Sequence, residues 1–319
     1  MKSVDLTQFF KKCGLDIGYI EILETEGMYP FNPDFMANWV YFTFLGYQRL
    51  RDILIEESNS PETFACVAAG SGVEVIGLAR IFPCIERFFV TDIDSDVMSG
   101  CSTNVSKILN WGIRVFPLIG SLCNPLRPYA GELDLIHGNI PNLPCSDEKD
   151  LSSGDDKGTF IKQKDLGAVP SDYSAWGLES QYAYLRGAYE VLRKGGSVVT
   201  LLGGRFPLNL TDELFKRCGL ELMPEFSVGF KYQTQPEIDY VGYHEIEKRY
   251  GIEFDFFRYE EALGILKGNK ILNPTFKHSG QEIKDMLRNA RVSAGEALEL
   301  HKKGIRCGHT VHLFRGRKN

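Results

Sequence analysis

The sequence predicts an α/β protein built on a mostly parallel β-sheet. Short apolar runs of strand length alternate with longer segments in which apolar residues recur at helical spacing. The pattern is clearest in residues 64–94, where a strand, a glycine turn, a helix and a second strand ending in an acid follow one another. Strands and helices that alternate in this way indicate βαβ units, whose strands run parallel.

The remaining elements are placed by the same patterns. The predicted strands are residues 64–68, 87–91, 113–118, 133–137, 197–202, 220–226, 253–257 and 310–314. The predicted helices are residues 35–44, 73–81, 95–110, 180–192 and 211–218, with further helices within 258–305. Residues 194–196, Lys-Gly-Gly, are expected to end the fourth of these helices as a C-cap, and Thr211 to cap the fifth. Residues 1–60 are expected to form a helical cap on a domain of residues 61–319.

Composition excludes several classes of protein. Lys plus Arg number 36 and Asp plus Glu 42, which gives a net charge of −6 and argues against nucleic acid as the main partner. The eight cysteines form no C-x-x-C motif, and reduced, buried thiols in a cytoplasmic protein explain them most simply. We expect no secretory leader, because residues 1–19 contain no apolar core typical of one, and no apolar run reaches membrane-spanning length. No metal-ligand spacing links His137, His244 and His309, so no metal site is expected.

The glycine turn indicates a nucleotide site. Ala69, Gly70 and Gly72 follow the first strand, and glycines let a ligand approach the backbone. Asp92, 22 residues after Gly70, stands where a carboxylate can accept hydrogen bonds from ribose hydroxyls. A dinucleotide fingerprint would require glycine at position 75, which is Val75. The turn therefore favours S-adenosylmethionine, which has a ribose and no pyrophosphate, over NAD.

Loops after the later strands point at the same crevice, because ligands bind outside the carboxyl ends of parallel strands. Asn139 and Pro141 follow the fourth strand, although Asn-x-Pro-Asn is also ordinary turn chemistry. Arg205 follows the fifth strand, and its guanidinium can bind a carboxylate bidentately. The polar residues 145–174, directly after the Asn139 loop, are expected to form a lid. Trp39 and Tyr41 are candidates for the pocket mouth, although most aromatic side chains of their helix are expected to pack on the sheet.

The order of these parts resembles a class I S-adenosylmethionine-dependent methyltransferase. The Asn139 loop and the following Trp-Gly-Leu at 176–178 resemble the glutamine N-methyltransferases of the release-factor type. A closer resemblance is to the methyltransferase domain of methionine S-methyltransferase. The motifs that carry it are the Gly-x-Ile-Pro-x loop at 138–142, Gly-Gly-Arg at 203–205, His-Glu-Ile-Glu-Lys at 244–248, Phe-Asp-Phe-Phe at 254–257, and Trp39 with Phe-Thr-Phe at 42–44.

The resemblance implies a Rossmann-like class I methyltransferase fold with a seven-stranded, mostly parallel sheet and helical additions at both ends. It implies S-adenosylmethionine as cofactor, held by Ala69, Gly70, Gly72, Asp92, Ile93, Ser121, Leu122 and Asn139. It implies a catalytic loop at Asn139 and Pro141, and acceptor binding by Arg205, Gly203, Trp39 and Tyr41.

The implied reaction is methylation of the sulfur of L-methionine to S-methyl-L-methionine, a step towards dimethylsulfoniopropionate in stand-alone bacterial enzymes of this type. Three alternatives stay open: N-methylation of a glutamine side chain, N-methylation of a small amine, and a cofactor-binding protein without activity. The expected partner is a small molecule, with a homodimer as an open option.

Overall fold

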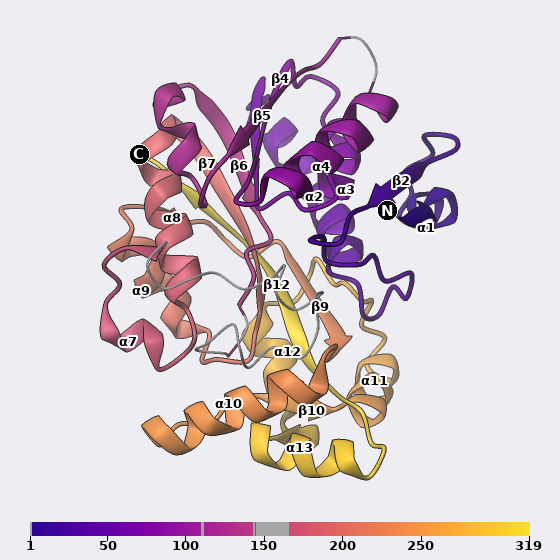
Figure 1. Ribbon diagram of the computed structural model, residues 1–319. Coiled ribbons are helices and arrows are strands. Elements are labelled where there is room, and N and C mark those ends of the chain that lie inside the picture. Colours follow the sequence, from indigo (N-terminus) through magenta and orange to yellow (C-terminus); the bar gives the residue numbers. More distant parts are fainter. Residues whose placement is uncertain (1, 110–111, 143, 145–165) are drawn as a thin grey trace.

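The computed structural model of the protein describes residues 2–109, 112–142, 144 and 166–319. A ten-stranded sheet lies at its centre, with helices on both faces (Figure 1). The strands run in the order β11-β10-β12-β7-β6-β3-β4-β5, and β8 and β9 also pair with β12. Their bounds are β3 Thr63–Val67, β4 Arg87–Asp92, β5 Arg114–Ile119, β6 Leu133–Gly138, β7 Leu192–Gly203, β8 Glu221–Leu222, β9 Ser227–Tyr232, β10 Phe256–Arg258, β11 Arg291–Val292 and β12 Cys307–Arg317.

The sheet confirms the predicted Rossmann-like α/β fold. Strands β5, β4, β3, β6 and β7 all pair in parallel, and in chain order they read 3-2-1-4-5, which is the doubly wound order. β12 runs antiparallel to β7 and β9, so the sheet is mixed. The sheet was expected to have seven strands, and over the described residues it has ten: β3 to β7 and β12, together with β9 and the short strands β8, β10 and β11. The chain reverses its direction across the sheet between β3 and β6, which is where such folds bind ligands.

Helices cover both faces of the parallel strands. The first face carries α2 (Trp39–Glu56), α3 (Val73–Ile81) and α4 (Ser95–Ile108), and the second carries η1 (Asn124–Tyr129), α8 (Glu179–Val191) and α9 (Asn209–Arg217). Side chains alternate between the faces: Phe64 and Cys66 of β3 lie in the first core, and Ala65 and Val67 in the second. Because both faces are buried, the strand reads as a continuous apolar run.

The N-terminal segment differs from the expected helical cap. β1 (Lys2–Asp5) and β2 (Glu21–Glu24) form a two-stranded antiparallel sheet around α1 (Thr7–Lys12). β2 packs on α4, where Leu23 N–H donates to Asn104 Oδ1 at 2.8 Å. α2 begins at Trp39 and not at residue 35, because the Asn38 side chain accepts the Val40 N–H at 2.8 Å and caps the helix there.

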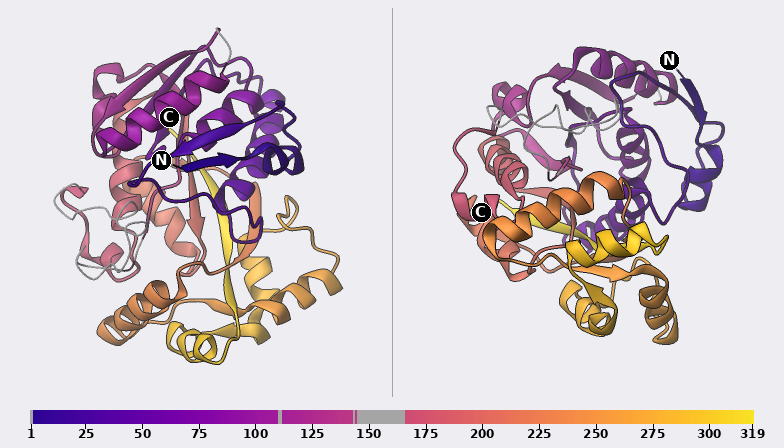
Figure 2. Two further views of the ribbon diagram at one scale, coloured as in Figure 1. Left: turned by 45° about the vertical axis from the view of Figure 1, so that its right-hand side comes forward. Right: turned by 60° about the horizontal axis from the view of Figure 1, so that its bottom comes forward.

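The segment between β9 and β12 gathers at one end of the molecule (Figures 1 and 2). It contains α10 Pro236–Tyr250, α11 Tyr259–Gly268, α12 Gly280–Met286, η3 Arg288–Ala290 and α13 Ala294–Lys302. The helices predicted within 258–305 are confirmed. α10 was not predicted, and its close packing on α13 shows why a polar helix is stable there.

Three local predictions are wrong. α8 ends at Val191, and Gly195 lies within β7, where its N–H donates to Lys318 O at 2.7 Å, so residues 194–196 are no C-cap. α9 begins at Asn209, and the Thr211 hydroxyl donates back to Leu208 O. Residues 220–226 form only the two-residue β8, because the longer strand β9 starts at Ser227.

The expected lid is described only in part. Residues 145–165 lie outside the described residues, and the rest contains the short helix α7 (Ser171–Ser174). Within the described ranges, no helix has both the length and the apolar character that crossing a bilayer requires.

Candidate active site

A cavity of about 980 Å³ opens at the carboxyl ends of the parallel strands. Its walls come from the glycine turn after β3, the ends of β4 and β5, the loop after β6 and the turn after β7. Of the residues singled out in the sequence, those in the lining are Trp39, Ala69, Gly70, Asp92, Ile93, Ser121, Leu122, Asn139, Pro141, Gly203 and Arg205. The fold therefore brings together side chains that are up to 166 residues apart in the chain.

The glycine turn and Asp92 form one wall. Gly70 N–H donates to Asp92 Oδ2 at 3.0 Å, and Asp94 N–H lies 3.3 Å from Oδ1, so the carboxylate is fixed in orientation. Burial raises the pKa of Asp92, and these backbone bonds oppose the rise. Gly70 has φ +53°, and a Cβ placed on it would meet no atom within 4 Å. A ligand can thus reach this backbone, and its hydroxyls can share the Asp92 carboxylate.

Two further backbone contacts shape the wall beside Asp92. Gly120 N–H donates to Asp92 O at 2.8 Å, and Leu122 O accepts the Thr91 hydroxyl at 3.1 Å. Ile93 is half exposed at the cavity edge, where an apolar side chain can cover a flat ring.

The loop after β6 is held by side chains that bind its carbonyl groups. Gln181 Nε2 donates to Ile140 O at 3.2 Å, Ser180 Oγ to Pro141 O at 3.0 Å, and the Tyr243 hydroxyl to Asn142 O at 3.3 Å. The first two donors come from α8 and the third from α10. The loop is thus fixed from two sides of the molecule.

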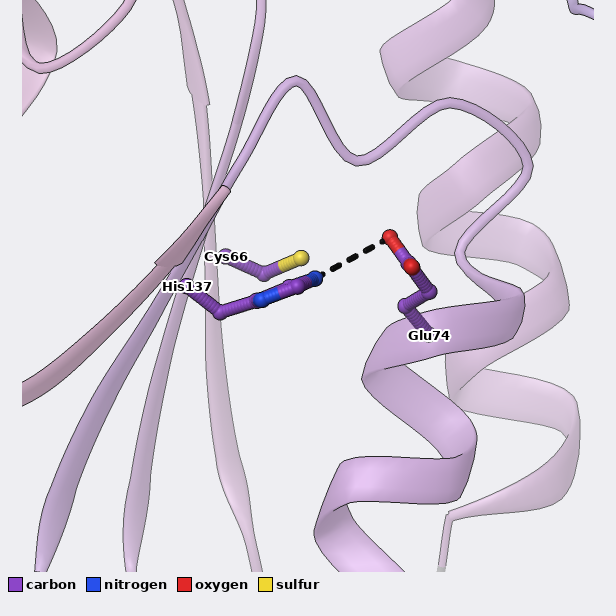
Figure 3. A group of neighbouring side chains, drawn as sticks. All are labelled: Cys66, Glu74 and His137. Carbon is purple, nitrogen blue, oxygen red and sulfur yellow. Dashed lines mark ion pairs between the residues drawn. The ribbon is translucent and has the colours of Figure 1, made fainter. Parts of the chain in front are cut away.

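Beneath Asn139 lies a buried polar cluster that the sequence did not predict (Figure 3). Cys66 of β3 and His137 of β6 point toward Glu74 at the start of α3. Each of the three offers one atom that could bind a metal ion, and these atoms lie within 4.8 Å of one another. His137 Nε2 is 3.2 Å from Glu74 Oε2, although neither ring nitrogen makes a well-aligned hydrogen bond with a described residue. The three residues come from three elements, so no spacing rule could have found them.

Arg205 is buried in the cavity wall that follows β7. One guanidinium nitrogen, Nη1, donates to Gln233 Oε1 at 3.0 Å and lies 3.1 Å from His309 Nε2, and the group stacks 4.8 Å from the centre of the Tyr243 ring. Burial, and next the Arg205 charge, hold the pKa of His309 well below its usual range. The neutral ring can therefore accept a hydrogen bond from Arg205 at Nε2. The other ring nitrogen, His309 Nδ1, then donates to Thr310 O at 2.8 Å. No ion pair to a described carboxylate is formed by Arg205.

The two aromatic candidates differ. Trp39 lines the cavity, with its ring 5.4 Å from that of His309 and 4.6 Å from Lys231 Nζ. Burial, and next the Arg205 charge, lower the pKa of Lys231 to about 7. Tyr41 is not in the lining and packs on Phe35 and Phe42 instead. Of the two roles considered for Tyr41, lining the pocket mouth and packing within the fold, its contacts fit packing.

No protein-family model matches the chain. Over 110 residues the chain is 30% identical to a release factor glutamine methyltransferase from Thermosynechococcus vestitus. That match covers 30% of this chain and 37% of the other, so the chain spans little more than a third of this curated relative's length.

Several solved structures share the general arrangement. A candidate methyltransferase from Bacillus halodurans is 12% identical, with 84% of this chain and 98% of the other covered and a TM-score of 0.41. The YcgJ protein from Bacillus subtilis is 10% identical, with 84% and 97% covered and a TM-score of 0.42. A Haemonchus contortus phosphoethanolamine N-methyltransferase solved with S-adenosylhomocysteine is 10% identical, with 88% and 60% covered and a TM-score of 0.38. The strand order, and not these modest likenesses, defines the fold.

Proposed function

We propose that the protein is an S-adenosylmethionine-dependent methyltransferase. The observation that carries the proposal is the convergence of the glycine turn, the oriented Asp92 carboxylate and the Asn139 loop on one cavity at the topological switch point. Ala69, Gly70, Ser121 and Leu122 would complete the cofactor site, whereas Gly72, also expected there, is not in the lining and faces Val105 and Cys101 of α4. The partial match to a glutamine methyltransferase and the resemblance in the motifs support the same class.

The charge of the cavity fits a cationic cofactor. Among the described residues, the lining carries six acids, Glu26, Glu74, Asp92, Asp94, Asp96 and Asp239, and Arg205 is the only Lys or Arg. A concave site with this balance attracts positive charge. S-adenosylmethionine supplies a methyl group on a positively charged sulfur, so the cofactor and the lining are complementary.

The acceptor we propose is the sulfur of L-methionine. Arg205 would bind the methionine carboxylate, because its guanidinium is desolvated, fixed by Gln233 and His309, and not already engaged by a described carboxylate. Gly203 lies in the lining beside it, and a Cβ there would come within 3.0 Å of the Arg205 guanidinium. Trp39 would give the acceptor an aromatic wall.

The residues can perform this reaction without an acid or base. A thioether has no proton to lose, so the chain needs only to align the acceptor with the methyl group and to exclude water. The Asn139 loop, with its carbonyl groups held by Gln181, Ser180 and Tyr243, gives a rigid wall for that alignment. The face of Trp39 would stabilise the sulfonium charge that the acceptor gains.

The second candidate is N-methylation of a glutamine side chain. The glutamine methyltransferase match favours it. An amide acceptor must lose a proton, and the Asn139 loop would have to orient that amide nitrogen.

The deciding experiment incubates purified protein with methyl-labelled S-adenosylmethionine and a panel of free amino acids and glutamine peptides, with mass spectrometry as the readout. We expect labelled S-methylmethionine and no methylated peptide. Omitting each acceptor in turn is the control. A labelled glutamine peptide with unmodified methionine would establish the second candidate. No product, together with no S-adenosylmethionine binding in calorimetry, would refute the methyltransferase proposal.

A further inference from the structure

Glu74 is a buried carboxylate on the wall of the cavity, and the proposed transfer step needs no acid or base from it. It lies two residues after Gly72 in the first turn of α3, and 9% of its side chain is exposed. It lines the cavity together with Gly70 and Asn139. A carboxylate removed from water is costly unless it is paired, so its partners decide what it does.

The partners that the chain supplies hold Glu74 in place and leave its charge poorly balanced. Oε1 accepts the Thr43 hydroxyl at 2.9 Å, and the Asn139 amide reaches it at 3.5 Å, near the limit for a hydrogen bond. Both of these donors are neutral. Arg205, the only Lys or Arg that the described part of the chain contributes to the lining, is instead engaged by Gln233 and His309. The His137 ring is near Oε2 but poorly aligned with it (Figure 3).

The geometry points to Glu74 as the group that receives a ligand's primary ammonium in the cavity. This inference rests on the proposed function. An ammonium carries three donors and one charge, which matches an oriented carboxylate beside the Asn139 side chain. Two ligands of the proposed reaction carry an α-ammonium, the cofactor and methionine. Glu74 lies in the first turn of α3, directly after the glycine turn that binds Asp92, whereas Gln233 bonds both Arg205 and Asp239, so we assign the ammonium at Glu74 to the cofactor.

A metal ion is the competing occupant of this cluster. Cys66, Glu74 and His137 offer sulfur, oxygen and nitrogen ligands, which is a set that zinc accepts. Metal binding requires the thiolate, and burial raises the pKa of Cys66 well above its usual range, so the thiol form is favoured. Metal analysis must nevertheless accompany the test.

The test compares S-adenosylhomocysteine with 5′-methylthioadenosine, which lacks the amino-acid portion, by calorimetry on the wild type and on Glu74→Gln. The amide keeps an acceptor for Thr43 and removes the charge. We expect Glu74→Gln to weaken S-adenosylhomocysteine binding by about 10- to 150-fold, which is the worth of a charge-assisted hydrogen bond, and methylthioadenosine binding by less than about 3-fold. Glu190→Gln, the same chemical change at an exposed glutamate that pairs with Arg127 and is not in the described lining, is the matched control and should leave both affinities unchanged.

A second measurement needs no variant. Deaminated S-adenosylhomocysteine should bind the wild type about 10- to 150-fold more weakly than S-adenosylhomocysteine itself. This arm decides the proposal if Glu74→Gln does not fold.

Several results would overturn the inference. Equal weakening of both nucleosides would show a general distortion, and an effect on the KM of methionine alone would assign the ammonium to the acceptor. Stoichiometric metal in the purified protein that is lost in Cys66→Ser, but not in Cys123→Ser, would assign Glu74 to a metal site. If the wild type binds neither nucleoside, the proposed function falls and this inference falls with it. Unchanged S-adenosylhomocysteine affinity in Glu74→Gln, with wild-type binding intact, would refute this inference alone.

Discussion

Arg205 shows how a single side chain can separate the two acceptor classes. Arg205→Ala is expected to lower kcat/KM for methionine by about 30- to 5000-fold, because removing one member of a buried charge pair costs about 2–5 kcal/mol. The loss should appear mainly in KM, with the affinity for S-adenosylhomocysteine nearly unchanged. Arg205→Lys should recover only part of the rate, because an ammonium cannot replace a bidentate guanidinium. Steady-state kinetics with methionine gives the measurement.

Methionine amide and a surface arginine supply the controls. The amide lacks the carboxylate, so it should be a poor substrate that Arg205→Ala affects little. Arg217→Ala removes an arginine that pairs with Glu213 on the surface, and it should leave kcat/KM unchanged. Equal turnover of methionine and its amide by the wild type would place the carboxylate site elsewhere.

Burial of Lys231 makes the stability of the folded protein depend on pH, and the direction of that dependence follows from the direction of its pKa shift. Burial lowers its pKa to about 7, whereas an unfolded lysine keeps its proton to about pH 10.4. Between these values the unfolded chain binds more protons, so the contribution of Lys231 to stability is lost as pH falls and rises as pH increases. Lys231→Met removes this linkage, and its Tm relative to the wild type should therefore decrease steadily between about pH 7 and about pH 10.

Thermal unfolding of both proteins across this range provides the measurement. Lys248→Met, which removes an exposed lysine paired with Glu245, should run parallel to the wild type. Parallel curves for Lys231→Met would show that Lys231 keeps an ordinary pKa in the folded protein.

The sequence predicted the position of a site residue where that residue stands at the end of a recognisable strand. Asp92, Asn139 and Arg205 each follow a parallel strand, and the carboxyl ends of such strands meet. Glu74 was missed because its neighbours His137 and Thr43 become adjacent only when β6 and α2 pack on α3. Gln233, which orients Arg205, lies just after β9, and that strand was itself not recognised.

At the scale of elements, the parallel core could be predicted and its surroundings could not. β3, β4, β6 and β7 contain near-continuous apolar runs because helices cover both faces, whereas β5, at the edge of the sheet, has no fully buried residue. β9 reads Ser-Val-Gly-Phe-Lys-Tyr, and its glycine and lysine interrupt the apolar run by which a buried strand is recognised in a sequence. Within the fold, Gly229 leaves room for Phe42, and Lys231 is covered by Trp39. Tertiary packing thus decides the assignment of β9.

The two glycines at the start of α3 should respond differently to alanine. Gly72 has φ +81°, and a Cβ there would lie 2.8 Å from Val105 Cγ2 and 2.9 Å from Cys101 Sγ. Gly72→Ala should therefore destabilise the protein by roughly 2–5 kcal/mol, the sum of backbone strain and overpacking. Gly70→Ala has only the strain, about 1–2 kcal/mol, but it should weaken S-adenosylhomocysteine binding because Gly70 lines the cavity.

Urea denaturation and calorimetry on the two variants supply the comparison, and each variant serves as the control for the other. Equal destabilisation would contradict the packing at Gly72. Unchanged ligand affinity in Gly70→Ala would remove this backbone from the binding site.

At the scale of the whole molecule, the segment between β9 and β12 contacts the turn after β7 through Asp255 and Lys284. Asp255 N–H donates to Arg205 O at 2.7 Å, and its carboxylate pairs with Lys284 and Arg291. Lys284 also donates to Phe206 O at 2.8 Å. This segment therefore holds the turn that carries Arg205, and its stability and acceptor binding should be coupled.

Asp255→Ala tests that coupling. It leaves Lys284 buried without its carboxylate, which should cost about 3–5 kcal/mol of the free energy of unfolding, measured in urea. Adding Lys284→Met should restore part of that loss, because the double variant no longer buries an unpaired charge. Asp285 is an exposed acid that pairs with Arg288 and lies in α12 beside Lys284. Asp285→Ala should change stability by less than about 1 kcal/mol. Because the Asp255 carboxylate pairs with Lys284, whose ammonium donates to Phe206 O in the turn that carries Arg205, the KM for methionine should rise in Asp255→Ala while the affinity for S-adenosylhomocysteine is unchanged. Strict additivity of the two substitutions, or an unaltered KM, would show that this segment does not support the Arg205 turn.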